Sequence, residues 1–159
     1  MSLPRPRFRP ATTEDEPFLL DLTARLADFP LPEWRTAGEI AQADHRILLD
    51  ALRHETPDAL VLIAEAPDGA PAGYIFARTA TDYFTSQRHA HVEVLAVAPD
   101  HEGMGLGRAL LEQAEVWASG RGYRQLTLNV FARNERARQV YEHLGYQPET
   151  MHYRKALPR

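Results

Sequence analysis

A glycine-rich turn, HEGMGLGRALL at residues 101–111, stands directly before a run with helical periodicity. Helix N-termini present unpaired N–H groups and a partial positive charge, so such a turn can wrap several backbone donors around an anion, usually a phosphate. The same glycines also suit a tight strand-to-helix turn that binds nothing, and the pattern alone does not separate the two roles.

Two common nucleotide-binding motifs do not fit this turn. A dinucleotide fingerprint needs a third glycine at position 108 or 110, where Arg108 and Leu110 stand. A P-loop needs a lysine after the glycines, and the chain's only lysine is Lys155. The turn therefore requires a different kind of phosphate ligand, if it binds one.

A second group of reactive side chains precedes the turn, in the segment HAHVEVLAV at residues 89–97. Its even positions are uniformly apolar, whereas the odd positions change along the strand from His89, His91 and Glu93 to Leu95 and Val97. Glu93 suits either a general base or a salt bridge to one of the many arginines. The two histidines suit a base or, less well, a metal pair, because no third ligand is placed by the sequence.

Composition limits the remaining classes of function. The 159 residues are 44% hydrophobic and 25% charged, as in one globular domain covering 1–159, and the absence of cysteine excludes thiolate chemistry. A net charge of −4 with scattered arginines argues against nucleic-acid binding. No run approaches a membrane span and the N-terminus lacks an apolar signal region, so we expect no membrane partner and a cytoplasmic location.

The elements that must position these residues can be read from periodicity and capping. Thr13 with Glu16 and Thr36 with Glu39 form capping boxes before two amphipathic helices, the second ending before Pro57. Strands are expected at 59–66, 72–79 and 89–97.

The second half of the chain alternates. The helix after the glycine turn is expected to end in a left-handed cap at Gly120, followed by a strand at 125–130, a helix from Asn134 to Gly145 and a closing strand at 151–157. The order β-α-α-β-β-β-α-β-α-β predicts an α/β fold with a mixed central sheet and flanking helices.

Two segments carry a family resemblance. LAVAPDHEGMGLGRALL resembles the acetyl-CoA signature of the GNAT superfamily of N-acetyltransferases, and NERARQVYEHLGY at 134–146 is similar to that superfamily's N-x-x-A-x-x-x-Y-x-x-x-G-[FY] segment. The element order fits the superfamily over nearly the whole chain. The resemblance implies a GNAT-like fold and acetyl-CoA-dependent transfer of acetyl to a primary amine of a small molecule or peptide, without a metal.

The resemblance also implies which residues hold the coenzyme. The turn's amides would bind the pyrophosphate, the preceding strand would bond the pantetheine arm, and the Leu95 N–H would polarise the acetyl carbonyl. Glu102 departs from the family pattern, which has Arg or Gln there, and Arg108 offers partial compensation. The implied binding residues are Leu95, Ala96, Val97, Gly103, Met104, Gly105, Leu106, Gly107, Arg108 and Asn134.

Catalytic roles follow from the same resemblance. Tyr141 matches the position that protonates the coenzyme sulfur, although it also fits as a core aromatic. Glu93 matches a frequent general base, with His91 or water as alternatives. Asn134 is both a natural N-cap and the match to a coenzyme contact.

The acceptor and the assembly are less defined. The resemblance places the acceptor beside FPLPEW, with Phe29 and Trp34, and beside QPETMHY, with His152 and Tyr153. It also suggests a homodimer. A non-catalytic module that binds acetyl-CoA is the alternative function.

Overall fold

The structure, a computed structural model, describes residues 5–54 and 56–159, which form two compact units divided after Asn129. The first unit holds the whole sheet and three α-helices, and the second holds α4 and the C-terminal segment. The fold is α/β, as predicted. The prediction of one domain over 1–159 stays a prediction.

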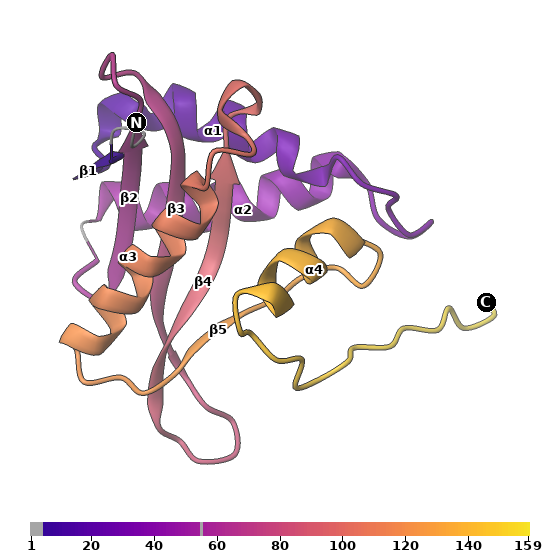
Figure 1. Cartoon of the computed structure of the whole chain (residues 1–159). Coiled ribbons are helices and arrows are strands. Elements are labelled where there is room, and N and C mark those ends of the chain that lie inside the picture. The colour runs from indigo at the N-terminus through magenta and orange to yellow at the C-terminus, as the bar shows by residue number, and fades with distance from the viewer. Residues whose placement is uncertain (1–4, 55) are drawn as a thin grey trace. The chain divides into compact units, whose positions relative to one another are not determined.

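The sheet of the first unit has five strands in the spatial order β1-β2-β3-β4-β5 (Figure 1). The first four strands are antiparallel, and β5 runs parallel to β4. The sheet is therefore mixed, as predicted, and its parallel step is where the helical crossover returns the chain. The strands are β1 (Arg7–Pro10), β2 (Ala59–Glu65), β3 (Pro71–Thr81), β4 (Arg88–Val97) and β5 (Leu126–Leu128).

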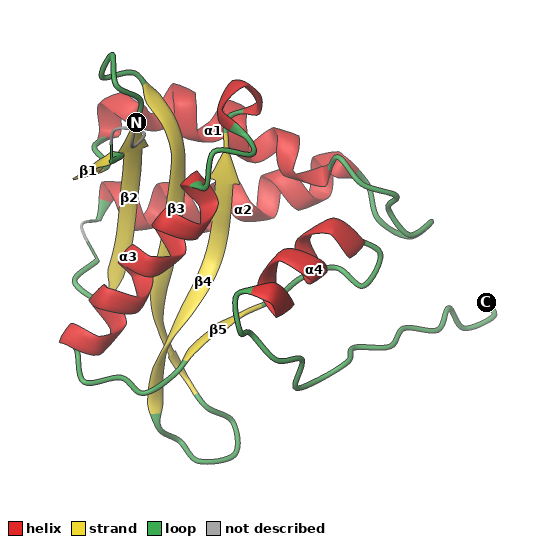
Figure 2. Cartoon of the chain, viewed as in Figure 1, coloured by secondary structure: helices red, strands yellow, loops and turns green. Residues whose placement is uncertain are grey.

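Helices cover both faces of this sheet (Figure 2). α1 (Glu16–Ala24) and α2 (Ala37–Arg53) lie on one face, and α3 (Leu106–Gly120) lies on the other, against β2, β3 and β4. The two-helix face encloses a core cluster that removes large apolar side chains from water and so stabilises this half of the fold. The cluster consists of Leu19, Leu22, Leu48, Ile63, Tyr74, Phe76, Val94 and Ala96.

The second capping box forms as predicted, but the first does not. The Glu39 N–H donates to Thr36 Oγ1 at 3.2 Å, and the Thr36 N–H donates to Glu39 Oε2 at 3.1 Å. The first box uses Thr12 with Asp15, one residue earlier than predicted, and begins the short 3₁₀ helix Thr13–Asp15 that leads into α1. Glu16 is instead the partner of Arg53, because the 3₁₀ turn moves its side chain towards α2.

The predicted glycine cap of α3 is also displaced. Gly120 is the last helical residue, and Gly122 takes the left-handed conformation with φ 77°. Its N–H donates to the Ser119 carbonyl at 2.9 Å, which closes the turn. The chain has two glycines in this turn, and periodicity could not tell which one adopts the positive φ.

In the second unit, α4 (Glu135–His143) begins and ends as predicted. The Asn134 Oδ1 atom accepts from the Ala137 N–H at 3.3 Å, and Gly145 has φ 95°. The predicted closing strand at 151–157 is wrong, since residues 144–159 contain no strand. A strand needs a hydrogen-bonded neighbour, and this unit contains no other strand to provide one.

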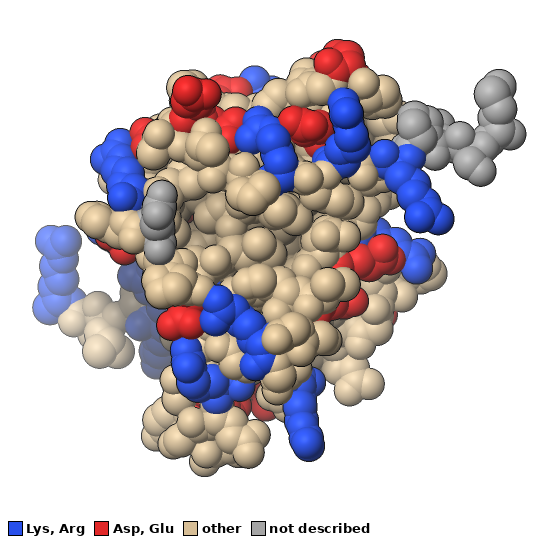
Figure 3. Space-filling view, turned by 90° about the vertical axis from the view of Figure 1, so that its left-hand side faces the viewer, with Lys and Arg blue, Asp and Glu red and all other residues tan. Residues whose placement is uncertain are grey.

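The surface carries charges of both signs. On the face shown in Figure 3, basic and acidic side chains are interspersed around a largely uncharged centre, without one dominant basic patch. No helix among the described residues is long and apolar enough to cross a membrane.

Candidate active site

The pairing of β3 with β4 is interrupted at Glu93. Phe76 lies opposite Val94, but the next residue of β3, Ala77, lies opposite Val92. Glu93 is therefore the extra residue of a β-bulge, which bends β4 and re-aims its side chains. The alternation of the strand, which the sequence predicted to be continuous, is broken at Glu93.

The pairing of β4 with β5 ends at the same place. The last of the three parallel pairs involves Val92, so no described strand follows β4 beyond that residue on this edge. On the opposite edge the Ala98 N–H donates to the Ala72 carbonyl at 2.8 Å. Because N–H groups alternate in direction along a strand, those of Leu95 and Val97 point away from β3, towards the open edge.

The glycine turn lies just after this open edge. Gly103 and Gly105 have φ values of 76° and 78°, a conformation that disfavours other residues, and a Cβ at either would have no atom within 4 Å. The first helical bond of α3 runs from the Ala109 N–H to the Gly105 carbonyl at 3.1 Å. The amides of residues 106–108 therefore lack helical acceptors and border an open space, as an anion site requires.

The side chains of the turn contribute less to this space than its backbone amides do. Met104 is 57% exposed, and Arg108 bonds to Glu112 at 3.0 Å, one turn along the helix. Ala96, on the preceding strand, is buried in the core. Backbone donors, rather than side chains, are therefore what this region offers a ligand.

The bulge also separates residues that the sequence placed on one face. Val97 lies against α3, since a Cβ on Gly107 would come within 3.7 Å of its Cγ2 atom, and Leu95 shares that face by alternation. Glu93 instead bonds to Arg78, whose side chain lines a pocket with residues of α2. The prediction of one continuous face from the histidines to Val97 is wrong, because the extra residue reverses the alternation.

Glu93 has the arginine partner that the sequence left open. The Arg78 Nε–H donates to Glu93 Oε1 at 2.5 Å, and the Glu93 side chain is 17% exposed. Asp44 of α2 lies near Glu93. Burial raises the pKa of the Asp44 carboxyl group, and the negative charge of Glu93 raises it further. Two carboxylates therefore share this region with one arginine partner, which leaves a net negative charge beside the open edge.

His91 is oriented by β5. Its Nδ1 atom lies 2.8 Å from Thr127 Oγ1, and His89 Nε2 lies 3.1 Å from the same oxygen. The Thr127 hydroxyl also lies 3.5 Å from the Ala90 carbonyl, to which it can donate while it accepts from the imidazoles. In the tautomer of neutral His91 whose Nδ1 carries the proton, Nε2 is the proton acceptor.

The environment of His91 favours its neutral form. Burial lowers its pKa from the ordinary 6.5, Glu93 opposes this shift, and the charges of His89 and Arg78 add to it. In His89 the remaining nitrogen, Nδ1, is buried without a hydrogen-bond partner, so it is inaccessible to a substrate. Among the described residues no three His, Asp or Glu side chains gather as a metal site would require.

Tyr141 and Asn134 belong to the second unit. Tyr141 lies on α4 with its ring 6.1 Å from that of Tyr146, edge to face, and burial raises the pKa of its hydroxyl. The raised pKa keeps the phenol protonated at neutral pH, as a proton donor requires. Asn134 performs the capping role predicted for it.

Three residues of the site were missed in the sequence. Arg78, Asp44 and Thr127 come from β3, α2 and β5, and each meets β4 only through the tertiary fold. No motif includes them. The one available signal was the polarity of Arg78 and Thr127 within strands that are mostly apolar.

Comparison with known proteins identifies the family. The acetyltransferase (GNAT) family matches residues 20–146. A mycothiol acetyltransferase of Beutenbergia cavernae is 34% identical over 64% of this chain and 33% of its own length. A streptothricin acetyltransferase of Streptomyces lavendulae is 32% identical over 61% of this chain and 49% of its own length. The chain thus spans a third to a half of these two relatives.

A solved structure agrees in fold. A putative acetyl transferase from Pyrococcus furiosus superimposes with a TM-score of 0.73 over 96% of this chain and all of that one, at 21% identity. Fold, open strand edge and glycine turn agree with the sequence match over residues 20–146. The chain belongs to the GNAT family of acetyltransferases.

Proposed function

We propose that the chain is an acetyl-CoA-dependent N-acetyltransferase that transfers acetyl directly to a primary amine. The proposal rests on one observation. The edge of β4 that no described strand pairs with is followed, after the glycine turn, by amides at the start of α3 that have no helical acceptors. An extended, hydrogen-bonding arm that ends in a pyrophosphate fits these two features together. Family membership and the bisubstrate CoA complex of a similar fold, AAC(6')-Iy, agree with this ligand.

The backbone of the first unit would hold the coenzyme. The amides of 106–108 would bind the pyrophosphate, and the outward N–H groups of Leu95 and Val97 would take part in binding the arm. When bound, acetyl-CoA supplies an activated thioester. The Leu95 N–H would then stabilise the negative charge that develops on the carbonyl oxygen.

Side chains would carry out two proton transfers, one from the amine and one to the thiolate. An amine with a pKa near 10 is protonated at neutral pH and must lose one proton before it attacks. Glu93 is two residues from Leu95, about 7 Å along the strand, and His91 is about twice as far, so Glu93 is the nearer acceptor. Tyr141 would donate a proton to the departing thiolate, and the second proton that the amine loses as the intermediate collapses would restore the Tyr141 hydroxyl.

The transfer would be direct because the chain contains no cysteine to carry an acyl group. The acceptor would be a small molecule or peptide, and homologous acetyltransferases are named for mycothiol, streptothricin and aminoglycosides. We also expect the family's homodimeric assembly.

Release of free thiol from acetyl-CoA in the presence of a panel of amines tests this proposal. An enzyme releases thiol in step with formation of the acetylated amine. A binding module, the alternative, would bind acetyl-CoA in calorimetry but release no thiol with any amine. Absence of acetyl-CoA binding would refute both functions.

A further inference from the structure

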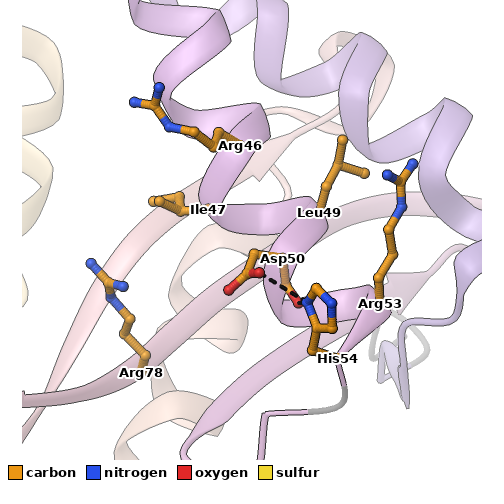
Figure 4. A pocket seen from close by; sticks show the side chains of 7 residues that line it. All are labelled: Arg46, Ile47, Leu49, Asp50, Arg53, His54 and Arg78. Carbon is orange, nitrogen blue, oxygen red and sulfur yellow. Dashed lines mark hydrogen bonds and ion pairs between the residues drawn. The ribbon is translucent and has the colours of Figure 1, made fainter.

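A pocket of about 470 Å³ lies between α2 and β3 (Figure 4). This volume is in the range of small-molecule sites. The pocket touches the proposed active centre through Arg78, which lines it and bonds to Glu93. Its lining residues are Arg46, Ile47, Leu49, Asp50, Arg53, His54 and Arg78.

Most of the charged groups in this lining already have partners. Arg53 bonds to Glu16 through two nitrogens, each at 3.0 Å, and Asp50 accepts from His54 at 2.9 Å. The Arg53–Glu16 pair joins opposite charges, and His54 holds Asp50 by a hydrogen bond. Two other arginines of the lining have no bidentate carboxylate partner among the described residues.

Those two arginines are Arg46 and Arg78. Arg78 uses Nε for Glu93, and its two terminal nitrogens have no partner among the described residues. Arg46 has no ion pair within residues 5–54 and 56–159. In Figure 4 both side chains extend to the same side of α2, with Ile47 between them. A guanidinium with free N–H groups is suited to a carboxylate or phosphate.

The charges around the pocket are of both signs. Arg46 and Arg78 provide two positive charges within its lining, which also contains the acidic Asp50. Glu93 of β4 is bonded to Arg78, and Asp44 of α2 lies near Glu93. A ligand that carries one ammonium and one anionic group complements this arrangement. An amine that carries only positive charge would be repelled by the two guanidinium groups.

We propose that the acceptor carries an anionic group as well as its amine, and that Arg46 and Arg78 bind this group while the amine faces Glu93. This inference rests on the proposed function and adds the chemical class of the acceptor. Ile47, which packs against the core and lines the pocket, gives the acceptor an apolar contact between the two charged ends.

Matched acceptor pairs test the proposal. We would compare L-phenylalanine with L-phenylalaninamide, and O-phosphoethanolamine with ethanolamine, by thiol release at fixed acetyl-CoA. We expect kcat/KM to be at least about tenfold higher for the anionic member of one pair, as one charge-assisted contact allows. The first pair reports a carboxylate site and the second a phosphate site.

Arg46→Gln assigns any preference to the pocket. It should raise KM for the preferred anionic acceptor about tenfold, leave kcat nearly unchanged, and leave KM for its neutral counterpart unaffected. Arg46→Glu should reverse the preference. Arg25→Gln removes an exposed arginine of the helical region that pairs with Asp21 and does not line the pocket, so it serves as the control.

Three results would overturn the inference. They are equal or faster acetylation of the neutral member of both pairs, an unchanged preference in Arg46→Gln, and an equal loss in Arg25→Gln. In each case the amines are still acetylated, so the proposed function survives. If no amine of the panel is acetylated, the proposed function fails and the inference falls with it.

Discussion

The two parts of β4 on either side of Glu93 present different chemistry. Before the bulge, the strand is hydrogen-bonded on both edges and offers side chains, with His91 opposite Arg78 and Thr127. After the bulge, the side chains of the strand are covered by the core or by α3, and no strand of the described residues pairs with one edge of its backbone. The part before the bulge can transfer protons and pair with charged groups, and the part after it can bind an extended ligand.

This difference divides the expected effects of substitution. Changes to side chains that act on protons should alter kcat with little effect on acetyl-CoA binding. Changes to the backbone conformation of the glycine turn should alter acetyl-CoA binding first. A side-chain substitution that mainly weakens acetyl-CoA binding, or a turn substitution that mainly lowers kcat, would contradict this division.

The largest expected effect is that of Tyr141→Phe, which tests whether a side-chain proton donor is needed at all. The substitution keeps the ring and its edge-to-face contact with Tyr146 but removes the hydroxyl. The kcat should fall by about 10²- to 10⁴-fold, with acetyl-CoA affinity and Tm nearly unchanged. Pre-steady-state rates with the best acceptor measure this. A full-rate variant would leave water as the donor.

Glu93→Gln should come next. Loss of the nearer proton acceptor should lower kcat about 10²-fold, and His91→Gln should lower it less, because His91 is farther from Leu95. Steady-state rates of the two variants, with Tm as the control for the lost Arg78 contact, make the comparison. If His91→Gln costs more, the imidazole is the base.

Gly105→Ala tests the backbone half. A Cβ at φ 78° is strained by about 1–2 kcal/mol and enters the open space beside the α3 amides. The Kd for acetyl-CoA should rise about tenfold in calorimetry, with a small fall in Tm. Gly120→Ala is the control at the other end of α3. A Cβ there meets no atom within 4 Å, so the Kd should not change, and the better helix former should raise Tm slightly. A lower Tm with unchanged Kd would make the turn purely structural.

The smallest expected effect concerns the pKa of His91. Burial lowers this pKa below 6.5, and the negative charge of Glu93 partly restores it by favouring the imidazolium. Glu93→Gln should therefore shift the His91 titration to lower pH, by less than about one unit for a partly screened charge. NMR titration of the His91 imidazole in the two proteins measures the shift. A shift to higher pH would contradict the arrangement.

Local patterns predicted most of the elements. The capping box at Thr36, the cap at Asn134 and the glycine at 145 lie where the sequence placed them. Each of these features depends only on residues within about one helical turn. The errors occur where two local solutions compete, as at Thr12 against Thr13 and at Gly122 against Gly120. The closing strand failed because pairing is not a local property.

Local sequence specifies the conformation of the backbone half of the candidate site. Glycines at 103 and 105 specify a turn that few other residues can adopt, and a helix N-terminus exposes its amides whatever surrounds it. The tertiary structure alone decided the side-chain half. The bulge at Glu93 arises from pairing with β3, and Arg78, Asp44 and Thr127 reach the site from separate elements. Charge pairs and proton acceptors depend on distances across the fold, which no spacing along the chain encodes.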